Sequence, residues 1–263
     1  MSDRVKITIK DHIADVVLNR ADKLNALDQE MFQALADAAD AIAIDSSVRA
    51  VVLHGAGGNF CAGIDVSALG ASQFDFADAL ATPLSPSPAN FFQRAAIAWR
   101  ELRVPVICAL EGIVYGGGMQ IALGADIRFA SPDAKLSIME SKWGLIPDMG
   151  LTVTLRGLVS PDRVKELAWT ARVLDSTEAQ SLGLVTAVST DPLAASFELA
   201  AECAARSPDA IRGIKALVNQ AWPLPDADAL ALEAELQSRI IGRANQIEAV
   251  QANLGRRQAE FKD

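Results

Sequence analysis

Short apolar runs that end in glycine alternate with helix-like segments through the first half of the chain. "RAVVLHGAG" (residues 49–57) and "VPVICALEG" (104–112) each predict a buried strand. A glycine triplet, a helix and a further strand in "ADIRFAS" (125–131) follow. Strands separated by helices need crossover connections, which favour a largely parallel sheet covered by helices. The sequence therefore predicts an α/β fold.

The N-terminal segment predicts a hairpin followed by a helix. "VKITIKDHIADVVLN" (5–19) reads as two strands that turn at Lys10-Asp11-His12. "ALDQEMFQALADAADAIAID" (26–45) predicts a helix that Asp28 can cap. Its apolar face is expected to consist of Met31, Leu35, Ala38 and Ile42.

From about residue 160 the sequence becomes helical. "SPDRVKELAW" (160–169) and "SPDAIRGIKALVNQ" (207–220) both open with serine and proline, an N-cap and first-turn pair. "TEAQSLGL" places Thr177 and Gln180 at capping-box spacing, with Gly183 as a stop. These signals predict several consecutive helices up to the C-terminal end of the sequence.

Residues 70–92, "GASQFDFADALATPLSPSPANFF", lack a clean period. They mix proline, serine and alanine with aromatic residues that we expect to be exposed. Segments of this kind are typically long loops or small lids, and such segments often carry specificity. We therefore predict a loop or lid that helps to shape a ligand pocket.

Composition excludes several classes of function. A net charge of −9 in 263 residues disfavours nucleic acid as the main partner. Three cysteines without CxxC spacing predict reduced thiols in a cytoplasmic protein. The chain has only two histidines and no G-x-S-x-G pattern, which disfavours a histidine metal site and a Ser-His-Asp triad. No apolar run reaches the length of a membrane span, and the N-terminus lacks the apolar core of a signal peptide.

Two glycine-rich loops, "HGAGGNFCAGIDV" (54–66) and "EGIVYGGGMQI" (111–121), follow predicted strands. Their glycines can serve simply as tight turns. Alternatively, they bring bare main-chain N–H groups close to a ligand oxygen, with a helix N-terminus behind them. Two such donors form an oxyanion hole. A dinucleotide loop is disfavoured because Phe60 stands where the third glycine of G-x-G-x-x-G belongs.

Four motifs occur in a characteristic order along the chain. They are "NRADKLNALDQEM", "GNFCAGIDV", "PVICALEGIVYGGGMQIALGADIRFAS" and "WGLIPDMG". Together they resemble the enoyl-CoA hydratase/isomerase, or crotonase, superfamily. The resemblance implies a crotonase-like ββα spiral core (residues 1–200) with an acyl-CoA site. It also implies a C-terminal helical trimerisation region (201–263), which would cover the active site, and assembly as a homotrimer or a dimer of trimers.

The resemblance also implies which residues meet the substrate, an acyl thioester of coenzyme A. The main-chain N–H groups of Ile64 and Gly117 would hold the thioester oxygen. Further substrate contacts are expected from Lys23, Leu24, Ala26, Ala62, Asp65, Val66 and Gly116, and from Phe261 and Lys262 of a neighbouring subunit's C-terminal tail. Lys23 can equally be a solvated surface lysine, and the tail can be frayed.

Hydratases of the family commonly use two glutamates. Glu140 matches the downstream one, but Gln120 stands at the first position, and an amide is neither an acid nor a base at neutral pH. Asp148 follows at an offset where dienoyl-CoA isomerases and an aryl-CoA dehalogenase of the family carry a working aspartate. As alternatives, Glu140 can pair with Lys142 or Arg128 at the surface, Asp148 can be a turn residue and Gln120 can bond within its loop.

Three functions follow from this set of residues. Double-bond migration in an enoyl- or dienoyl-CoA needs only a carboxylate that shuttles a proton, so isomerisation is favoured. Hydration by Glu140 and Asp148 is the first alternative, and an acyl-CoA-binding protein with weak or lost catalysis is the second. Neither a metal ion nor a redox cofactor is expected, because coenzyme A is part of the substrate.

Overall fold

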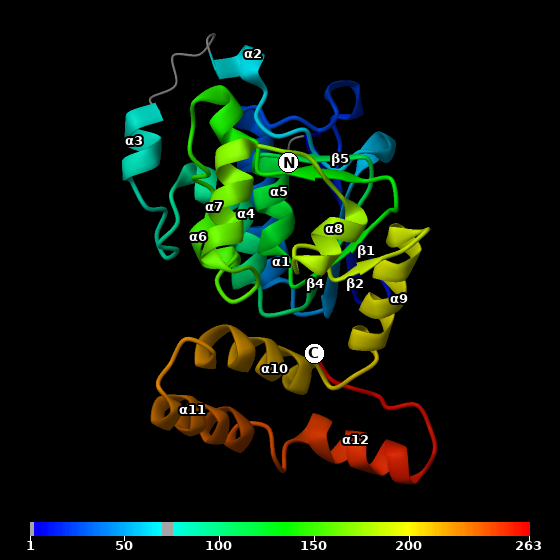
Figure 1. Cartoon of the computed structure of the whole chain (residues 1–263). Coiled ribbons are helices and arrows are strands. Elements are labelled where there is room, and N and C mark those ends of the chain that lie inside the picture. The colour runs from blue at the N-terminus through cyan, green and yellow to red at the C-terminus, as the bar shows by residue number, and fades with distance from the viewer. Residues whose placement is uncertain (1–2, 70–75) are drawn as a thin grey trace.

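The strands of the protein form two sheets (Figure 1). The computed structural model describes residues 3–69 and 76–263. The larger sheet has the order β1-β2-β3-β4-β6-β9 and the smaller has the order β5-β7-β8. The bounds are β1 Val5–Lys10, β2 Ile13–Leu18, β3 Ala50–Gly55, β4 Val106–Leu110, β5 Ile113–Tyr115, β6 Ile127–Ala130, β7 Lys135–Ser137, β8 Leu174–Asp175 and β9 Ala187–Val188.

Pairing within the larger sheet confirms the predicted α/β class. β1 and β2 form the expected antiparallel hairpin, and Asp11 and His12 at its turn have positive φ angles of 50° and 65°. From β2 onward every pair in this sheet is parallel. In the smaller sheet, β5 and β7 are parallel and β8 is antiparallel to β7. The sequence did not predict this smaller sheet, because its two- and three-residue strands are too short to show a period.

Helices cover both faces of the larger sheet. The bounds are α1 Gln29–Ile44, α2 Val66–Leu69, α3 Phe76–Ala81, α4 Phe91–Glu101, α5 Gly117–Gly124, α6 Leu151–Thr154, α7 Pro161–Thr170, α8 Ser176–Ser181, α9 Pro192–Ala204, α10 Pro208–Ala221, α11 Asp226–Ser238 and α12 Ala244–Leu254. α1, α4 and α5 lie on the main core, where the predicted face of Met31, Leu35, Ala38 and Ile42 is buried. α9 packs on the opposite face through Ala200 and Ala204.

Most predicted helix starts are confirmed, with one correction. The Asp28 carboxylate accepts a hydrogen bond from Met31 N at 2.9 Å, and Ser207 caps α10. The predicted capping box of Thr177 and Gln180 is wrong. The N-cap of α8 lies two residues earlier, at Asp175, whose carboxylate accepts from Glu178 N at 2.8 Å and satisfies the first turn. Gly183 follows the end of α8 with a φ of 82°, as expected.

Residues 70–92, predicted as a long loop or small lid with exposed aromatic residues, are irregular only at residues 82–90 in the described part of the chain, and the prediction that the aromatic residues are exposed is wrong for Phe92. Residues 70–75 lie outside the described part of the chain. After them comes α3, and α4 begins at Phe91 behind a capping box formed by Asn90 and Gln93. Phe92 is buried, edge-on to Phe32 with ring centroids 5.1 Å apart. The sequence suggested a loop because the aromatic packing that stabilises this segment comes from α1.

α10, α11 and α12 form a separate layer below the body (Figure 1). α9 crosses the predicted boundary at residue 200 and packs on the sheet, so the separate layer begins with α10. Lys215 of α10 is buried and ties this layer to the body through an ion pair with Asp126 at 2.7 Å. The C-terminal tail returns to the body, where Arg49 binds the Asp263 carboxylate at 2.7 Å and the Phe261 carbonyl at 3.0 Å.

Candidate active site

Two short parallel strands bring the glycine triplet next to Glu140. β5 ends at Tyr115 and β7 ends at Ser137, and these two residues are paired in register. The carboxyl ends of parallel strands lie at the same edge of a sheet. Gly116 N accordingly donates to Ser137 O at 3.0 Å. A Cβ atom on Gly116 would lie 3.7 Å from Oε1 of Glu140, so the triplet and the predicted base are neighbours.

The two glycine-rich loops touch each other. Gly116 has a φ of 51° and Gly63 a φ of 85°, conformations that favour glycine. A Cβ atom on Gly63 would come within 2.7 Å of Tyr115 O and 3.4 Å of Gly117 N. No larger residue fits at Gly63 without a shift of the backbone. The residue before Ile64 therefore lies directly against the amide of Gly117.

The amides of Ile64 and Gly117 are available to a ligand. Leu27 forms a parallel bridge to Ile64 by donating to Gly63 O at 2.8 Å and accepting from Asp65 N at 2.9 Å. Gly63 O and Asp65 N both face Leu27. In a strand the N–H of the residue between them points to the opposite side, so the Ile64 N–H faces away from Leu27. Neither this N–H nor that of Gly117 has an acceptor among the described residues. Gly117 is also the first residue of α5, where the helix end favours negative charge.

Glu140 is buried and held on one side only. Its Oε1 accepts from Gln120 Nε2 at 2.6 Å, while Oε2 is buried and has no hydrogen-bond partner within the described part of the chain. Burial raises the pKa of Glu140, and the charge of Asp148 raises it further, whereas hydrogen bonds from its own backbone and from Gln120 lower it. The alternative of a surface pair is wrong: Arg128 donates to the carbonyls of Leu184 and Ala125 instead.

Asp148 lies on the segment that packs against the glycine triplet. Solvent reaches Asp148, yet neighbouring protein atoms desolvate its carboxyl group enough to raise its pKa. The next residue, Met149, is buried, and its Sδ would be 2.9 Å from a Cβ atom on Gly117. The residue after Asp148 therefore packs on Gly117, and the Asp148 charge is near enough to Glu140 to raise its pKa.

The predicted coenzyme-binding stretches also lie side by side. Ala62 N donates to Leu24 O at 3.0 Å, which aligns residues 23–27 with residues 62–65. Leu24 and Val66 are large apolar side chains that remain exposed, as does Lys23, whereas Ala26 is buried and Ala62 is partly exposed. These two segments leave exposed positions from which side chains can contact a ligand.

Arg20 and Asn25 hold these stretches in place, and the sequence analysis missed both. Arg20 bonds the Asp65 carboxylate at 2.8 Å, and Asp65 also accepts from the Ser67 hydroxyl, which lowers its pKa. Fully buried Asn25, with a φ of 56°, donates to the carbonyls of Ala56 and Asn59. The asparagine in "DKLNA" was a signal for this left-handed position. Asp65 is therefore engaged in holding the loop.

The predicted tail residues lie far along the fold from this region within their own chain. Phe261 and Lys262 are bound through their backbones by Arg49 and Asn245. Arg49 precedes β3, whereas the first glycine loop follows it, so the tail lies at the opposite end of the strand. A contact from the tail of a neighbouring subunit stays a prediction.

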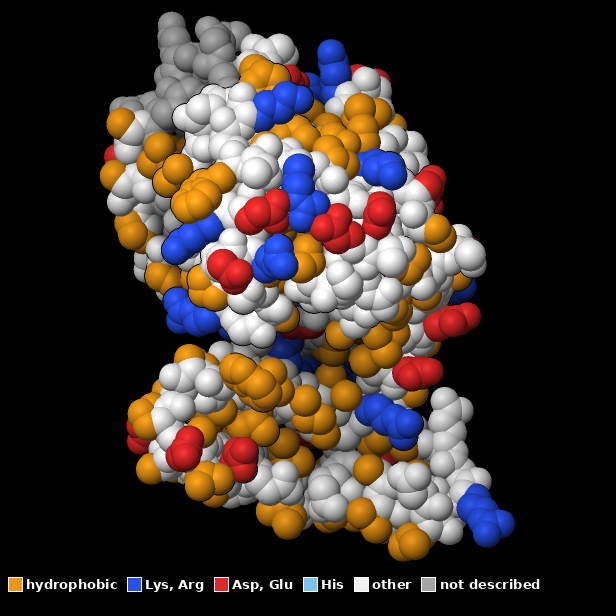
Figure 2. All heavy atoms as spheres, in the orientation of Figure 1, with side chains coloured by type: hydrophobic (Ala, Val, Ile, Leu, Met, Phe, Trp, Pro, Cys, Tyr) orange, Lys and Arg blue, Asp and Glu red, His pale blue; other side chains and the backbone are white. Residues whose placement is uncertain are grey.

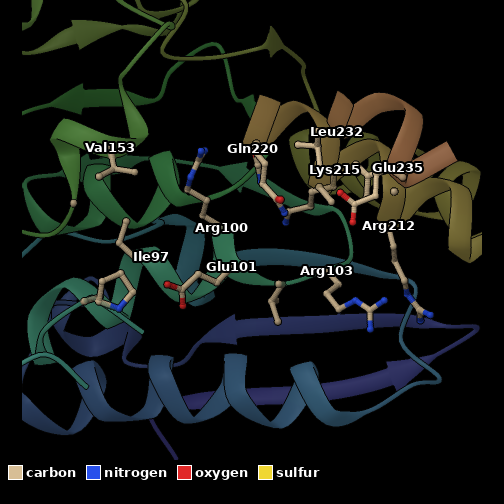
Figure 3. Close-up of a pocket in the computed structure, with 18 of the residues that line it drawn as sticks. Ile97, Arg100, Glu101, Arg103, Val153, Arg212, Lys215, Gln220, Leu232 and Glu235 are labelled. Carbon is tan, nitrogen blue, oxygen red and sulfur yellow. The ribbon is translucent and has the colours of Figure 1, made fainter. Parts of the chain in front are cut away.

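A groove of about 1120 Å³ separates the body from the C-terminal helices (Figure 3). Ile97 and Arg100 of α4 line it from the body, and Arg212 of α10 and Leu232 of α11 line it from the other side. Gly150 and Val153, just after Asp148, also line it. None of the predicted site residues lines this groove, so it is distinct from the glycine loops.

Within residues 3–69 and 76–263, no three or more His, Cys, Asp or Glu side chains are grouped as metal ligands. In the same ranges, none of the helices has the length and apolar character needed to cross a membrane.

Two free main-chain amides beside a buried carboxylate, at the ends of parallel strands, define an enzyme class. Such enzymes stabilise an oxyanion while a carboxylate moves a proton. The family model for enoyl-CoA hydratase/isomerase matches residues 8–263, and the chain belongs to this family. Members of this family act on thioesters of coenzyme A. The family match confirms the resemblance, and the structural match given below confirms the crotonase-like fold predicted from the sequence.

Three relatives illustrate the range of this family. The chain is 32% identical to enoyl-CoA hydratase EchA19 of Mycobacterium tuberculosis, over 87% of this chain and 85% of that protein. It is 32% identical to 1,2-epoxyphenylacetyl-CoA isomerase of Escherichia coli, over 95% and 94%. The crystal structure of an enoyl-CoA hydratase from Bacillus anthracis superposes with a TM-score of 0.89 at 27% identity, covering 98% of this chain and 99% of that one.

Proposed function

We propose that the protein is an enoyl-CoA isomerase that moves a double bond through an enolate. The proposal rests on positions 120 and 140, where hydratases of the family commonly carry two glutamates and this chain has only one. Glu140 has one buried oxygen with no hydrogen-bond partner in residues 3–69 and 76–263, and Gln120, which cannot exchange a proton, occupies the other position. One carboxylate is sufficient for a proton shuttle, whereas hydration must also activate water.

The reaction can be written for a 3-enoyl thioester. Glu140 removes a proton from C2, and the electrons of that bond move onto the thioester oxygen, which the amides of Ile64 and Gly117 hold. The same carboxyl group then returns the proton to C4, and the double bond ends between C2 and C3. The raised pKa of Glu140 suits both halves of this shuttle, because a catalytic pKa nearer neutrality serves as base and as acid.

Turnover in deuterated water tests the proposal. A panel of unsaturated acyl-CoAs, beginning with 3-hexenoyl-CoA, would be followed by mass spectrometry for deuterium at C2 and C4 and for added water. Migration of the double bond from C3 to C2 without a hydroxyl product supports the isomerase, and the share of deuterium at C4 reports how far the shuttled proton exchanges with solvent. Tight binding of every thioester with neither double-bond migration nor exchange would overturn the proposal in favour of an acyl-CoA-binding protein.

Hydration is the second candidate, and one observation favours it. The charge of Asp148 raises the pKa of Glu140, so the two carboxyl groups are close enough to interact and could flank one substrate. Asp148 would then replace the missing glutamate and help to activate water. A 3-hydroxyacyl-CoA product in the same experiment would identify this reaction. Relatives described as hydratase and as isomerase are about equally similar to the chain.

The coenzyme is proposed to lie along residues 23–26 and 62–66. Lys23 would meet a phosphate, and Leu24, Ala26, Ala62 and Val66 would flank the pantetheine and adenine. Asp65 would act mainly by holding this loop through Arg20. No metal or redox cofactor is required by the proposed reaction. The three cysteines are all free thiols, which favours a cytoplasmic location.

The C-terminal helices support assembly with further copies of the chain. α11 has no buried residue in the single chain. Large apolar side chains are exposed over α10–α12 and the segments joining them, and Figure 2 shows the hydrophobic surface in this layer: Ile214, Val218, Trp222, Leu224, Leu230, Ile241, Ile247, Val250 and Leu254. Exposed apolar surface on this scale marks protein interfaces. A homotrimer or a dimer of trimers would cover it and bring Phe261 and Lys262 of one copy toward the coenzyme of another.

A further inference from the structure

Gln120 makes two hydrogen bonds that fix the orientation of its amide. Its Oε1 accepts from Met149 N at 2.8 Å, and its Nε2 donates to Glu140 Oε1 at 2.6 Å. A main-chain N–H can only donate, so the amide oxygen must face Met149 and the amide nitrogen must face Glu140. The residue is 1% exposed, which leaves no room for solvent to exchange these partners.

This orientation makes the two oxygens of Glu140 unequal. Oε1 faces an N–H donor, so a proton on Oε1 would meet another hydrogen and lose the bond. Oε2 is buried and has no partner among the described residues. We propose that Gln120 is a positioning residue that keeps Oε1 of Glu140 unprotonated and makes Oε2 the only atom that carries the proton. This inference rests on the proposed function of Glu140 as the base.

The same amide connects the two carboxyl groups of the site. Met149 N belongs to the peptide bond that follows Asp148, so the hydrogen bond to Gln120 fixes the plane of that peptide. Gln120 thus spans from the segment of Glu140 to the segment of Asp148. Met149 in turn packs against Gly117, so the bridge also holds the base relative to the oxyanion amide.

The bond from Gln120 also affects the ionisation of Glu140. Burial raises the pKa of Glu140, and the Gln120 donor opposes that rise by stabilising the carboxylate. Without the donor, the carboxylate would form only at higher pH. A residue that merely filled space would have no such effect.

The test is the pH dependence of kcat/KM for Gln120→Met, which keeps the side-chain length but cannot donate. With 3-hexenoyl-CoA, or whichever thioester of the panel is turned over, we expect kcat to fall about tenfold and the acidic midpoint to rise by about one pH unit, with KM little changed. Met119→Leu, a volume-conserving change on the same helix, is the matched control and should leave the midpoint in place.

Gln120→Glu is the second variant, in case Gln120→Met does not fold. A carboxylate at position 120 would repel that of Glu140 and also raise the midpoint. An unchanged midpoint in either folded variant would overturn the inference. The proposed function is tested separately, because its failure would appear as full activity in a variant that lacks the Glu140 carboxyl group.

Discussion

Helices α5 and α11 differ in how much of each helix is buried within the single chain. All eight residues of α5 are buried, between α4, the small sheet and the segment of Met149. None of the thirteen residues of α11 is buried, although the helix carries Leu230, Leu232 and Leu236. An isolated helix of that length is marginal in water, and most helical stability in proteins comes from tertiary packing. The core around α5 is therefore complete within one chain, whereas α11 leaves apolar surface that another copy can cover.

The two helices belong to parts of the molecule with different proposed roles: the body holds the catalytic groups, and the C-terminal layer mediates assembly. The amides, Gln120 and Glu140 are held by contacts within the body, so their geometry depends on one chain. The C-terminal layer is tied to that body at the buried pair of Lys215 and Asp126, at Arg212, which donates to backbone carbonyls before β3, and at the tail bound by Arg49. Variants in the body should change turnover, and variants in the outer helices should change association or stability.

The largest effect should come from Glu140→Gln. We expect kcat to fall about a thousandfold, because general acid–base groups contribute factors of this order, while the fold and the assembly remain intact. Steady-state kinetics, circular dichroism and sedimentation would be measured on the same preparation. Unchanged turnover of every unsaturated acyl-CoA would show that the body does not use this carboxyl group.

Lys215→Met should weaken the connection between the two layers. Removing one partner of a buried ion pair typically costs 3–5 kcal/mol, and we expect about 2–3 kcal/mol because Asp126 is partly exposed. Urea unfolding at a fixed protein concentration measures the change. The matched control is Arg239→Met, which removes an exposed pair with Glu235 and should cost less than about 1 kcal/mol. Equal costs would mean that Lys215 does not hold the layers together.

Leu230→Asp on α11 should dissociate the assembly. The side chain is 63% exposed in the single chain, so the charge costs little there, but it would be desolvated in an interface. Burying a leucine contributes about 1.5–3 kcal/mol, and this amount would be lost at each copy. Sedimentation velocity over a range of concentrations is the measurement.

The control for Leu230→Asp is Ile44→Asp at the end of α1, where the side chain is 88% exposed on the body. It should leave the assembly unchanged. Dissociation by Ile44→Asp, together with an intact assembly in Leu230→Asp, would place the interface on the body and not on the C-terminal helices.

The smallest effect should be a shift in pH dependence for Asp148→Asn. The negative charge of Asp148 raises the pKa of Glu140, so its removal lowers that pKa. A base must be ionised to act, and the acidic limb of kcat/KM should therefore move to lower pH, with kcat at neutral pH changing less than in Glu140→Gln. Loss of activity as large as that of Glu140→Gln would favour hydration, in which both carboxyl groups act.

Local signals predicted much of the body. The hairpin turn, the cap at Asp28 and the buried stripe of α1 depend on neighbours in sequence, and each was found where expected. The failures have different causes. The cap of α8 was placed two residues too late, because Asp175 and Thr177 are both possible caps and the structure uses Asp175. α4 begins within the last residues of the predicted loop or lid, where Asn90 and Gln93 form a local cap, but the packing of Phe92 on Phe32 joins residues far apart in the sequence.

The sequence by itself determined the family, the α/β class and the positions of the glycines, because backbone freedom and periodicity are local properties. Only the tertiary structure decided how Glu140 is used. β5 and β7 are too short to be recognised alone, yet their pairing places Glu140 beside Gly116. The bonds from Gln120 to Glu140 and from Met149 to Gln120 join residues 20 and 29 positions apart. Contacts over such separations arise only when the sheet is assembled, and they determine which carboxylate oxygen is free to carry a proton.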